Sequence, residues 1–577
     1  MLNNFPKIKF FLWLIFVFAL AILIWYSPVV FKGYSAQPVD FQGTAIMARN
    51  YVQHGVLGSE DDLNIVVAPS LVASKVNPTS LGNKLTIYGY AAIFKVLGQL
   101  TWGQMVLLAI AIQALSLVFF TITIFYLFGF RESIVFSLVY ILLPVNWRMA
   151  NTTTSYEFVL LFFSLFTVLF FCFKDRRIKW PFLILAGLFL GLSGLVKETM
   201  FLAFPVIFFW LWRNKKNREL FLIFVPVCLL LAAFWLPSFF NGTNEYLKLF
   251  IKTETAHSDF QYYGHAYIDP YTYHFDRESV PNEIEESTSN PDSGWLYYVS
   301  RLKAGANMGL RQVDLVERLS VGTVNLVRQI SKFMAIEDMG GPLIFLLMIF
   351  GFYHLKQRDK NIYSLFAIWL VVVPLLVSYV SLGVRNHLMD FSWVIAVLVA
   401  LGLVGLGPLL KNYYQLGKKA KVFHILVILI TLYSLVLADH VYWGRAYNNT
   451  QYLATKYLAD KISNYLVINE KTEDKIKIGD EEVIAVGHRM LHPGLNYMTE
   501  KSIVFFSPES INKLINNKQL QEGFDKFNIR YIVGYSEEVS NLIMKNSNVK
   551  NIANWPKPEE IEISSSYDKN WFLNVVK

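Results

Sequence analysis

Long apolar stretches recur along the chain, and polar segments of very unequal length separate them. A helix needs roughly 20 apolar residues to cross the hydrocarbon core of a bilayer. The stretches that reach or approach this length predict about eleven transmembrane helices, at residues 10–30, 103–127, 134–147, 156–173, 181–196, 199–212, 220–239, 342–355, 362–381, 389–410 and 422–440. Three of them are short, and each could instead be re-entrant: 134–147, 199–212 and 342–355.

Three long polar segments remain, at residues 31–102, at residues 240–341 and after about residue 441. In the first, Ala45–Val56 and Tyr88–Gly98 carry apolar residues at helical spacing, so we expect helices that lie along the membrane surface. The second becomes helical around Leu302–Phe333. In the last segment, patterns typical of helices and of strands alternate, which predicts a small α/β domain. Its helices are expected at 451–465 and 510–524, and its strands at 482–486, 502–506 and 530–533.

The composition agrees with a membrane protein. Apolar residues make up 54% of the chain and charged residues only 16%, whereas a soluble domain carries about a quarter charged residues. The formal net charge of +9 does not indicate a nucleic-acid partner, because the basic residues form short clusters between the apolar stretches. Both cysteines, Cys172 and Cys228, lie inside apolar stretches, where we expect buried thiols rather than a disulfide.

The basic clusters also predict the orientation. If the N-terminus is cytoplasmic, clusters such as Arg213–Arg218 and Lys356–Lys360 fall on the cytoplasmic side, and the short loops opposite hold only Arg148, Lys197 and Arg385. This bias is what the positive-inside rule requires. We therefore expect a multi-pass protein of the plasma membrane whose first stretch is an uncleaved signal anchor. Its transmembrane module would be residues 1–440, with an extracytoplasmic α/β domain at 441–577.

Ionisable residues stand at several outer helix ends, and such residues are functional candidates in membrane proteins. Asp40 follows the first predicted helix, and Glu157 begins the fourth. Lys197 interrupts a long apolar stretch, and Arg385 and His387 precede the tenth helix. Each also has an ordinary interpretation. Asp40 would be a solvated loop residue, and Glu157 an acid favoured by the helix dipole. Lys197 would lie in an exposed hairpin, and Arg385 and His387 would be interfacial anchors.

Taken together, these residues suit one kind of chemistry. Carboxylates can deprotonate a nucleophile or hold a divalent cation, and basic side chains can bind a phosphate. A membrane enzyme with a lipid-linked phosphate donor needs both sets.

Four short motifs carry a family resemblance. They are Asp40–Tyr51 followed by His54 and Gly55, Tyr88–Phe94, Thr154–Glu157, and the glycine-rich Gly187–Glu198. In their order and predicted topology they resemble the GT-C membrane glycosyltransferases, in particular the protein O-mannosyltransferase and aminoarabinose transferase group. The chain departs from the family where Phe41 replaces a second acid, and it lacks the Pro-Pro motif near the end of the first loop.

The resemblance implies an inverting transfer of a monosaccharide from a polyprenyl phosphate to an acceptor hydroxyl on a protein, a lipid or a cell-envelope glycan. Asp40 would be the general base, and Lys197 and Arg385 would stabilise the departing lipid phosphate. Glu157 would orient Asp40, bind the sugar or hold a cation, so a divalent cation is the one cofactor to consider.

Further substrate contacts are expected from Tyr88, Arg148 and His387 and, in the second outer loop, from Tyr262 and His265. That loop is rich in Tyr and His, but its spacing matches no metal motif, and an aromatic cover over the sugar is the better interpretation. The C-terminal domain would bind the acceptor or serve a structural purpose.

Other functions remain open at this stage. A transporter or flippase of a lipid-linked or small polar substrate would also be polytopic, although we find no internal repeat of the kind common in transporters. A polysaccharide polymerase or ligase would use a lipid-pyrophosphate donor, and we would expect arginine-rich outer loops in it. A structural membrane protein would give no reason for Lys197 and Glu198 within an apolar stretch.

Overall fold

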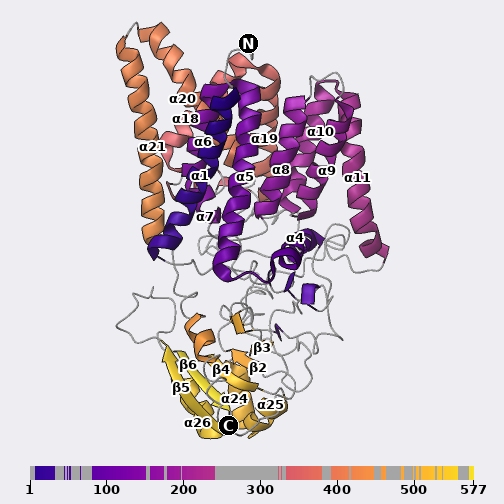
Figure 1. Ribbon diagram of the computed structural model, residues 1–577, viewed down its shortest axis with the longest axis vertical. Helices are drawn as coiled ribbons and strands as arrows, with labels where there is room; N and C mark the ends of the chain where they lie inside the picture. Colours follow the sequence, from indigo (N-terminus) through magenta and orange to yellow (C-terminus); the bar gives the residue numbers. More distant parts are fainter. Residues whose placement is uncertain are drawn as a thin grey trace.

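The computed structural model describes residues 7–32, 45, 48–49, 51–53, 65–66, 81–150, 156–173, 179–196, 198–240, 323, 326–327, 330, 333–334, 336–379, 392–414, 418–446, 456–462, 483–486, 495, 498–499, 502–505, 508–526, 529–535, 537–555 and 571–576. Most of the described residues are helical, and the long helices lie side by side in a bundle (Figure 1). The first residues of α1 lie at the end of the bundle that is remote from the C-terminal sheet (Figure 1).

A helix occupies each predicted apolar stretch. These helices are α1 (Lys7–Lys32), α5 (Trp102–Phe128), α6 (Phe130–Leu142), α8 (Tyr156–Phe173), α9 (Trp180–Val196), α10 (Ala203–Arg213), α11 (Asn217–Phe240), α18 (Pro342–Arg358), α19 (Lys360–Tyr379), α20 (Ser392–Tyr414) and α21 (Lys418–Ala446). Four segments in the described part of the chain are long and apolar enough to cross a membrane: Ile8–Phe31, Trp102–Phe128, Asn217–Phe234 and Lys421–Asp439. The total number of membrane crossings stays a prediction.

Two of the predicted stretches contain a break that the hydropathy pattern does not show. The stretch 134–147 divides into α6 and a short helix α7 (Pro144–Ala150), because Leu143 is extended and Pro144 has no amide hydrogen to donate to α6. The stretch 199–212 begins with a 3₁₀ turn, η1 (Glu198–Leu202), before α10 starts.

Close helix–helix contacts depend on glycine. A Cβ atom at Gly351 of α18 would lie 1.7 Å from the Leu398 carbonyl oxygen of α20, and one at Gly187 of α9 would lie 2.2 Å from the Ile223 carbonyl oxygen of α11. No side chain fits at either contact. Small residues let helix backbones approach closely in membranes, where packing rather than water exclusion drives association. Gly187 belongs to the glycine-rich motif, so at least part of that motif serves helix packing.

The bundle is filled by aromatic side chains. Phe120 of α5 stacks on Trp393 of α20, with ring centroids 5.5 Å apart and planes 6° from parallel. Phe163 and Trp369 pack against Trp393 at 5.8 and 5.5 Å, which adds α8 and α19 to the same cluster. Offset and edge-to-face aromatic pairs contribute about 0.5–1.5 kcal/mol each beyond the area they bury.

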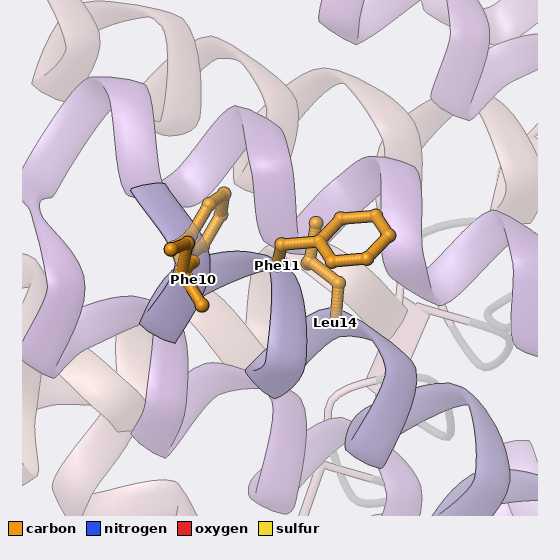
Figure 2. Close-up of a pocket in the computed structure, with 4 residues that line it drawn as sticks. Phe10, Phe11 and Leu14 are labelled. Carbon is orange, nitrogen blue, oxygen red and sulfur yellow. The ribbon is translucent and has the colours of Figure 1, made fainter. Parts of the chain in front are cut away.

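The outer surface of α1 is apolar. Figure 2 shows a shallow hollow beside this helix, and Ile8, Phe10, Phe11 and Leu14 line it. Phe11 is exposed, whereas Phe10 stacks on Phe125 of α5 with ring centroids 4.0 Å apart. Such a surface suits contact with acyl chains, and it offers no group for catalysis.

The C-terminal part contains a six-stranded sheet in the order β1-β3-β2-β4-β6-β5. The strands are β1 (Ile65–Val66), β2 (Val483–Val486), β3 (Ser502–Phe505), β4 (Ile529–Tyr535), β5 (Val549–Trp555) and β6 (Trp571–Val576). Strands β3, β2 and β4 are parallel to one another, and the remaining pairs are antiparallel. The associated helices are α24 (Pro508–Asn516), α25 (Leu520–Lys526) and α26 (Glu537–Asn546).

The three predicted strands, at 482–486, 502–506 and 530–533, are present in the sheet, whereas β5 and β6 were not predicted. Two further differences concern a helix and β1. The predicted helix 510–524 is two helices, α24 and α25, separated by a turn in which Lys518 has a φ of 60°. Strand β1 comes from the first polar segment, so the sheet draws on residues outside 441–577. The boundary between the predicted domains at residue 440 stays a prediction.

Candidate active site

A helix between the bundle and the sheet packs along α9 and touches the start of α8 at Phe158. This helix, α4 (Leu81–Leu97), lies between the bundle and the sheet (Figure 1) and holds the Tyr88–Phe94 motif. A Cβ atom at Gly89 would lie 3.0 Å from Phe158 Cζ, and Tyr90 meets Phe158 edge-to-face at 5.2 Å. Phe158 directly follows Glu157. The structure thus brings the Tyr88–Phe94 motif into contact with the residue that directly follows the Thr154–Glu157 motif.

The Asp40–Tyr51 motif of the first polar segment also reaches α4. Its last residue, Tyr51, packs edge-to-face on Tyr88 with ring centroids 5.3 Å apart. Arg49, two residues earlier, is buried, with 6% of its surface exposed. Arg49 lies within the Asp40–Tyr51 motif, but the sequence analysis did not identify it as a candidate site residue. Its position inside the motif is the signal that would have identified it.

Glu157 is the second residue of α8, where a carboxylate interacts favourably with the helix dipole. Its surface is only 1% exposed. If Glu157 served only to interact with the helix dipole, its carboxylate should be exposed to water, because burying a carboxylate is costly unless other groups compensate. Burial therefore favours a specific purpose for Glu157 over the ordinary interpretation.

Tyr88 is partly exposed and can reach a bound molecule. Burial raises the pKa of its hydroxyl above the ordinary value of 10.0, and the neighbouring Tyr51 is a smaller cause in the same direction. The hydroxyl is therefore protonated at neutral pH, and it can donate a hydrogen bond. Aromatic faces and a hydroxyl donor are suitable groups for holding a sugar.

A second group of polar residues lies where α6 gives way to α7. Asn146, fully buried in α7, donates from Nδ2 to the Tyr140 carbonyl oxygen at 2.8 Å and accepts at Oδ1 from Ser392 Oγ at 2.5 Å. Its own carbonyl oxygen accepts from Gln113 Nε2 at 3.3 Å. Asn146 lies inside the predicted stretch 134–147, but the sequence analysis did not identify it as a site residue, because its partners come from other helices.

Most of the sequence-predicted site residues lie outside the described part of the chain. These are Asp40, Lys197, Arg385, His387, Tyr262 and His265. For Arg148 the position in α7 is described but the side chain is not. Of the predicted residues whose side chains are described, Tyr88 precedes Gly89 and Glu157 precedes Phe158, and Gly89 and Phe158 meet across the α4–α8 contact. Among the described residues, no group of three or more His, Cys, Asp or Glu side chains could hold a metal ion.

No protein-family model matches the chain, and no curated protein matches it significantly. Solved structures do. The apo form of ArnT from Cupriavidus metallidurans matches with a TM-score of 0.52 at 11% identity, over 97% of each chain. Oligosaccharyltransferase AglB from Archaeoglobus fulgidus, in complex with an inhibitory peptide and a dolichol-phosphate, matches with a TM-score of 0.52 at 12% identity, over 96% of this chain and 75% of that one.

The chain has the GT-C fold. ArnT bound to undecaprenyl phosphate gives the same result, with a TM-score of 0.51 at 10% identity over 97% of this chain and 98% of that one. The GT-C fold and the long apolar helices also indicate a membrane protein. At these identities the likeness concerns the fold, so residue functions in this chain must be argued from its own side chains.

Proposed function

We propose that the protein is an inverting glycosyltransferase that moves a monosaccharide from a polyprenyl phosphate to an acceptor hydroxyl on the outer face of the plasma membrane. The observation that carries the proposal is the α4–α8 contact. There the end of the first-loop motif, through Tyr51 and Tyr88, lies beside the helix start that holds the buried Glu157. A GT-C fold with an acid buried at this junction is suited to sugar transfer.

In this proposal Asp40 is the general base that removes the proton from the acceptor hydroxyl, which then attacks the anomeric carbon. The bond from that carbon to the lipid phosphate breaks, and the phosphate leaves with the electron pair. General base catalysis of this kind contributes about 10²–10⁴ in rate. Glu157 orients Asp40, binds the sugar or holds a divalent cation.

The departing phosphate needs fixed positive charge. Lys197 and Arg385 supply it in the proposal, and Arg148 and His387 add contacts from the same predicted side of the membrane. Preorganised charge in a site that excludes water is usually the largest contribution to catalysis. Two of the similar structures contain dolichol-phosphate and undecaprenyl phosphate, which supports a lipid phosphate as the donor's carrier.

The acceptor is a hydroxyl of a protein, a lipid or a cell-envelope glycan. Tyr262 and His265 of the second outer loop would cover the sugar. The proposal includes no nucleic acid. The membrane itself is a partner, because the apolar surface of α1 and α21 matches acyl chains.

The test is sugar transfer in proteoliposomes, with radiolabelled polyprenyl-phosphate sugars as donors and a membrane extract as acceptor. Asp40→Asn should lower transfer at least a hundredfold at equal expression, and Glu157→Gln should lower it at least tenfold. Asp61→Asn, in the same polar segment, and Glu219→Gln, another acid in the first turn of an apolar helix, are the matched controls. Both controls should transfer sugar like the wild type.

Two results would count against the proposal. If Asp40→Asn matches the wild type, Asp40 is an ordinary loop residue and the base lies elsewhere. If the wild type moves label from none of the donors, uptake of the same lipid-linked sugars into the vesicles becomes the measurement, because transport would then explain the fold better than transfer.

A further inference from the structure

Two turns at the end of the bundle remote from the sheet lie side by side. One joins α10 to α11, and the other joins α18 to α19. The Trp210 indole of α10 donates from Nε1 to the Asn361 carbonyl oxygen of α19 at 2.8 Å. Lys216 lies over the same indole, with Nζ 4.9 Å from the ring centroid. One aromatic side chain therefore holds together two turns that are distant in the sequence.

The acids at these turns already have partners. Glu219 pairs with Lys179 at 2.7 Å, and Glu132 of the nearby α5–α6 turn pairs with Arg358. Asp359 caps the start of α19, because its Oδ1 accepts from two backbone amides at 2.9 and 3.0 Å. These carboxylates are therefore not available to neutralise further basic side chains.

Five basic side chains at the two turns form no ion pair or hydrogen bond within the described part of the chain. They are Arg213, Lys215, Arg218, Lys356 and Lys360. All five are exposed. We call the surface that they form the basic surface. Its positive charge is not balanced from within the described residues.

These side chains are not needed as helix caps. Basic residues at the end of a helix often bind its last carbonyl groups. In α10 other groups do so: Asn214 Nδ2 donates to the Trp210 oxygen at 2.7 Å, and the amides of Lys215 and Lys216 donate to two further carbonyls at 3.0 Å. Lys215 takes a φ of 54° in this turn, a conformation that is unfavourable for a lysine. The backbone thus closes the turn by itself.

Exposed aromatic side chains border the basic surface. Trp212, next to Arg213, is 62% exposed, and Phe209 and Phe221 are exposed about one turn away on α10 and α11. Tryptophan is enriched where a membrane meets water. A ligand that suits both kinds of residue has an anionic head at the level of the basic side chains and acyl chains beside the helices. A phospholipid has both parts, whereas a nucleic acid or a soluble acidic protein has no acyl chain.

We propose that the basic surface binds the phosphate headgroups of anionic phospholipids in the surrounding bilayer. Each Lys or Arg near a membrane surface strengthens the attraction to anionic lipids about fivefold. The two turns act as one surface because Trp210 joins them. This binding is separate from the orientation that basic clusters give to a membrane protein, and it does not depend on the reaction that the protein catalyses.

The test is lipid binding by the full-length protein in detergent micelles, measured by native mass spectrometry. Phosphatidylglycerol is the anionic probe, and phosphatidylcholine is the neutral comparison. The wild type should bind phosphatidylglycerol at least tenfold more tightly at about 0.05 M salt. Raising the salt to about 0.5 M should remove most of this preference, because salt screens exposed charges.

Arg213→Gln combined with Lys360→Gln removes one basic side chain from each turn and should lower the preference at least fivefold. Lys9→Gln combined with Lys421→Gln is the matched control. It removes the same charge from exposed residues at the starts of α1 and α21, and α21 lies on the other side of the bundle from α10 (Figure 1). The control should keep the wild-type preference. Arg213→Lys combined with Lys360→Arg, which keeps both charges, should also keep it.

Three results would overturn the proposal. They are equal binding of the two lipids by the wild type, a preference that persists at high salt, and a control that loses as much preference as the Arg213–Lys360 variant. Because basic residues also direct membrane insertion, the protease accessibility of a C-terminal tag should first be compared between variants in vesicles. If the Arg213–Lys360 variant inserts wrongly, the salt titration of the wild type decides.

Discussion

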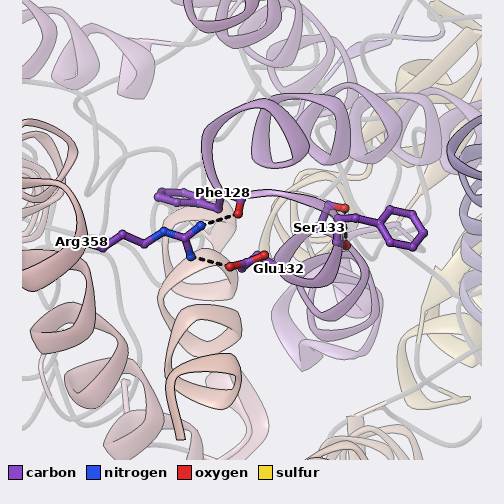
Figure 3. A network of polar contacts seen from close by, with 5 residues as sticks. Phe128, Glu132, Ser133 and Arg358 are labelled. Carbon is purple, nitrogen blue, oxygen red and sulfur yellow. Dashed lines mark hydrogen bonds and ion pairs between the residues drawn. The ribbon is translucent and has the colours of Figure 1, made fainter. Parts of the chain in front are cut away.

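Arg358 and Glu132 form an ion pair that joins two helix turns at the end of the bundle remote from the sheet (Figure 3). The same guanidinium donates to the Phe128 carbonyl oxygen, one of the carbonyls left over at the end of α5. Glu132 lies in the first turn of α6, and Arg358 in the last turn of α18. One side chain therefore holds the α5–α6 turn against the end of α18.

We expect Arg358→Leu to destabilise the protein by about 1–2 kcal/mol, a value reduced for the partial exposure of the arginine. The lost bonds leave Glu132 largely buried without its cation. The measurement is the thermal unfolding midpoint in detergent micelles. Arg131→Leu, at an exposed arginine in the same turn, should leave the midpoint unchanged. Arg358→Lys should fall between the two, since lysine cannot reach both acceptors with one planar group.

Gly351→Ala should separate α18 from α20. The added methyl group would lie 1.7 Å from a backbone oxygen that cannot move without its helix. We expect a loss of several degrees in the unfolding midpoint and a lower yield of folded protein. Gly191→Ala is the comparison, because the nearest atom there, at 3.0 Å, belongs to the flexible Leu230 side chain. Equal effects at the two positions would show that the close approach of the backbones is unimportant.

Gly89→Val should lower sugar transfer at least tenfold while the protein still folds. A side chain at this position would push α4 away from Phe158 and so from the start of α8. Transfer per folded molecule, measured after size-exclusion chromatography, tests this expectation. Lys95→Ala, in the last turn of the same helix, should transfer sugar normally. Undiminished transfer by Gly89→Val would mean that the α4–α8 contact does not shape the site.

Tyr535, at the end of the central strand β4, should make the sheet sensitive to alkali. Burial raises its pKa well above the ordinary value of 10.0. Above pH 10 the unfolded chain loses this proton and the folded sheet keeps it, so stability decreases by about 1.4 kcal/mol per pH unit between the two pKa values. Tyr535→Phe should remove this part of the decrease. Unfolding followed by circular dichroism between pH 9 and about 11 is the measurement.

The elements that depend on a local sequence pattern, the apolar helices above all, could be predicted from the sequence. Apolar stretches such as 103–127 became helices with nearly the same bounds, because membrane helices satisfy their own backbone and need no distant partner. Strands β5 and β6 were not predicted, since Val549–Trp555 mixes Lys, Asn and apolar residues without a clear alternation and its partner follows some 20 residues later. The break at Pro144 was readable from the proline alone, but it was not predicted.

Less of the candidate site could be predicted. Glu157 was chosen from its place at a helix start, but its burial comes from packing between segments far apart in the chain, which a local pattern does not show. Asn146 could not be identified from any local pattern, because its partners come from three different helices. A buried polar residue is defined by its neighbours in space, and a single sequence does not show them.

The pairing of Ile65 and Val66 with β3 has a consequence for biosynthesis. Roughly 440 residues separate β1 from β3, and a chain grows at about 5–20 residues per second. The first strand therefore waits on the order of 20–90 s, after its own synthesis, before its partner exists. During that time Ile65 and Val66 lack their partner strand, so the edge of the sheet beside β3 is completed only after Ser502–Phe505 has been synthesised.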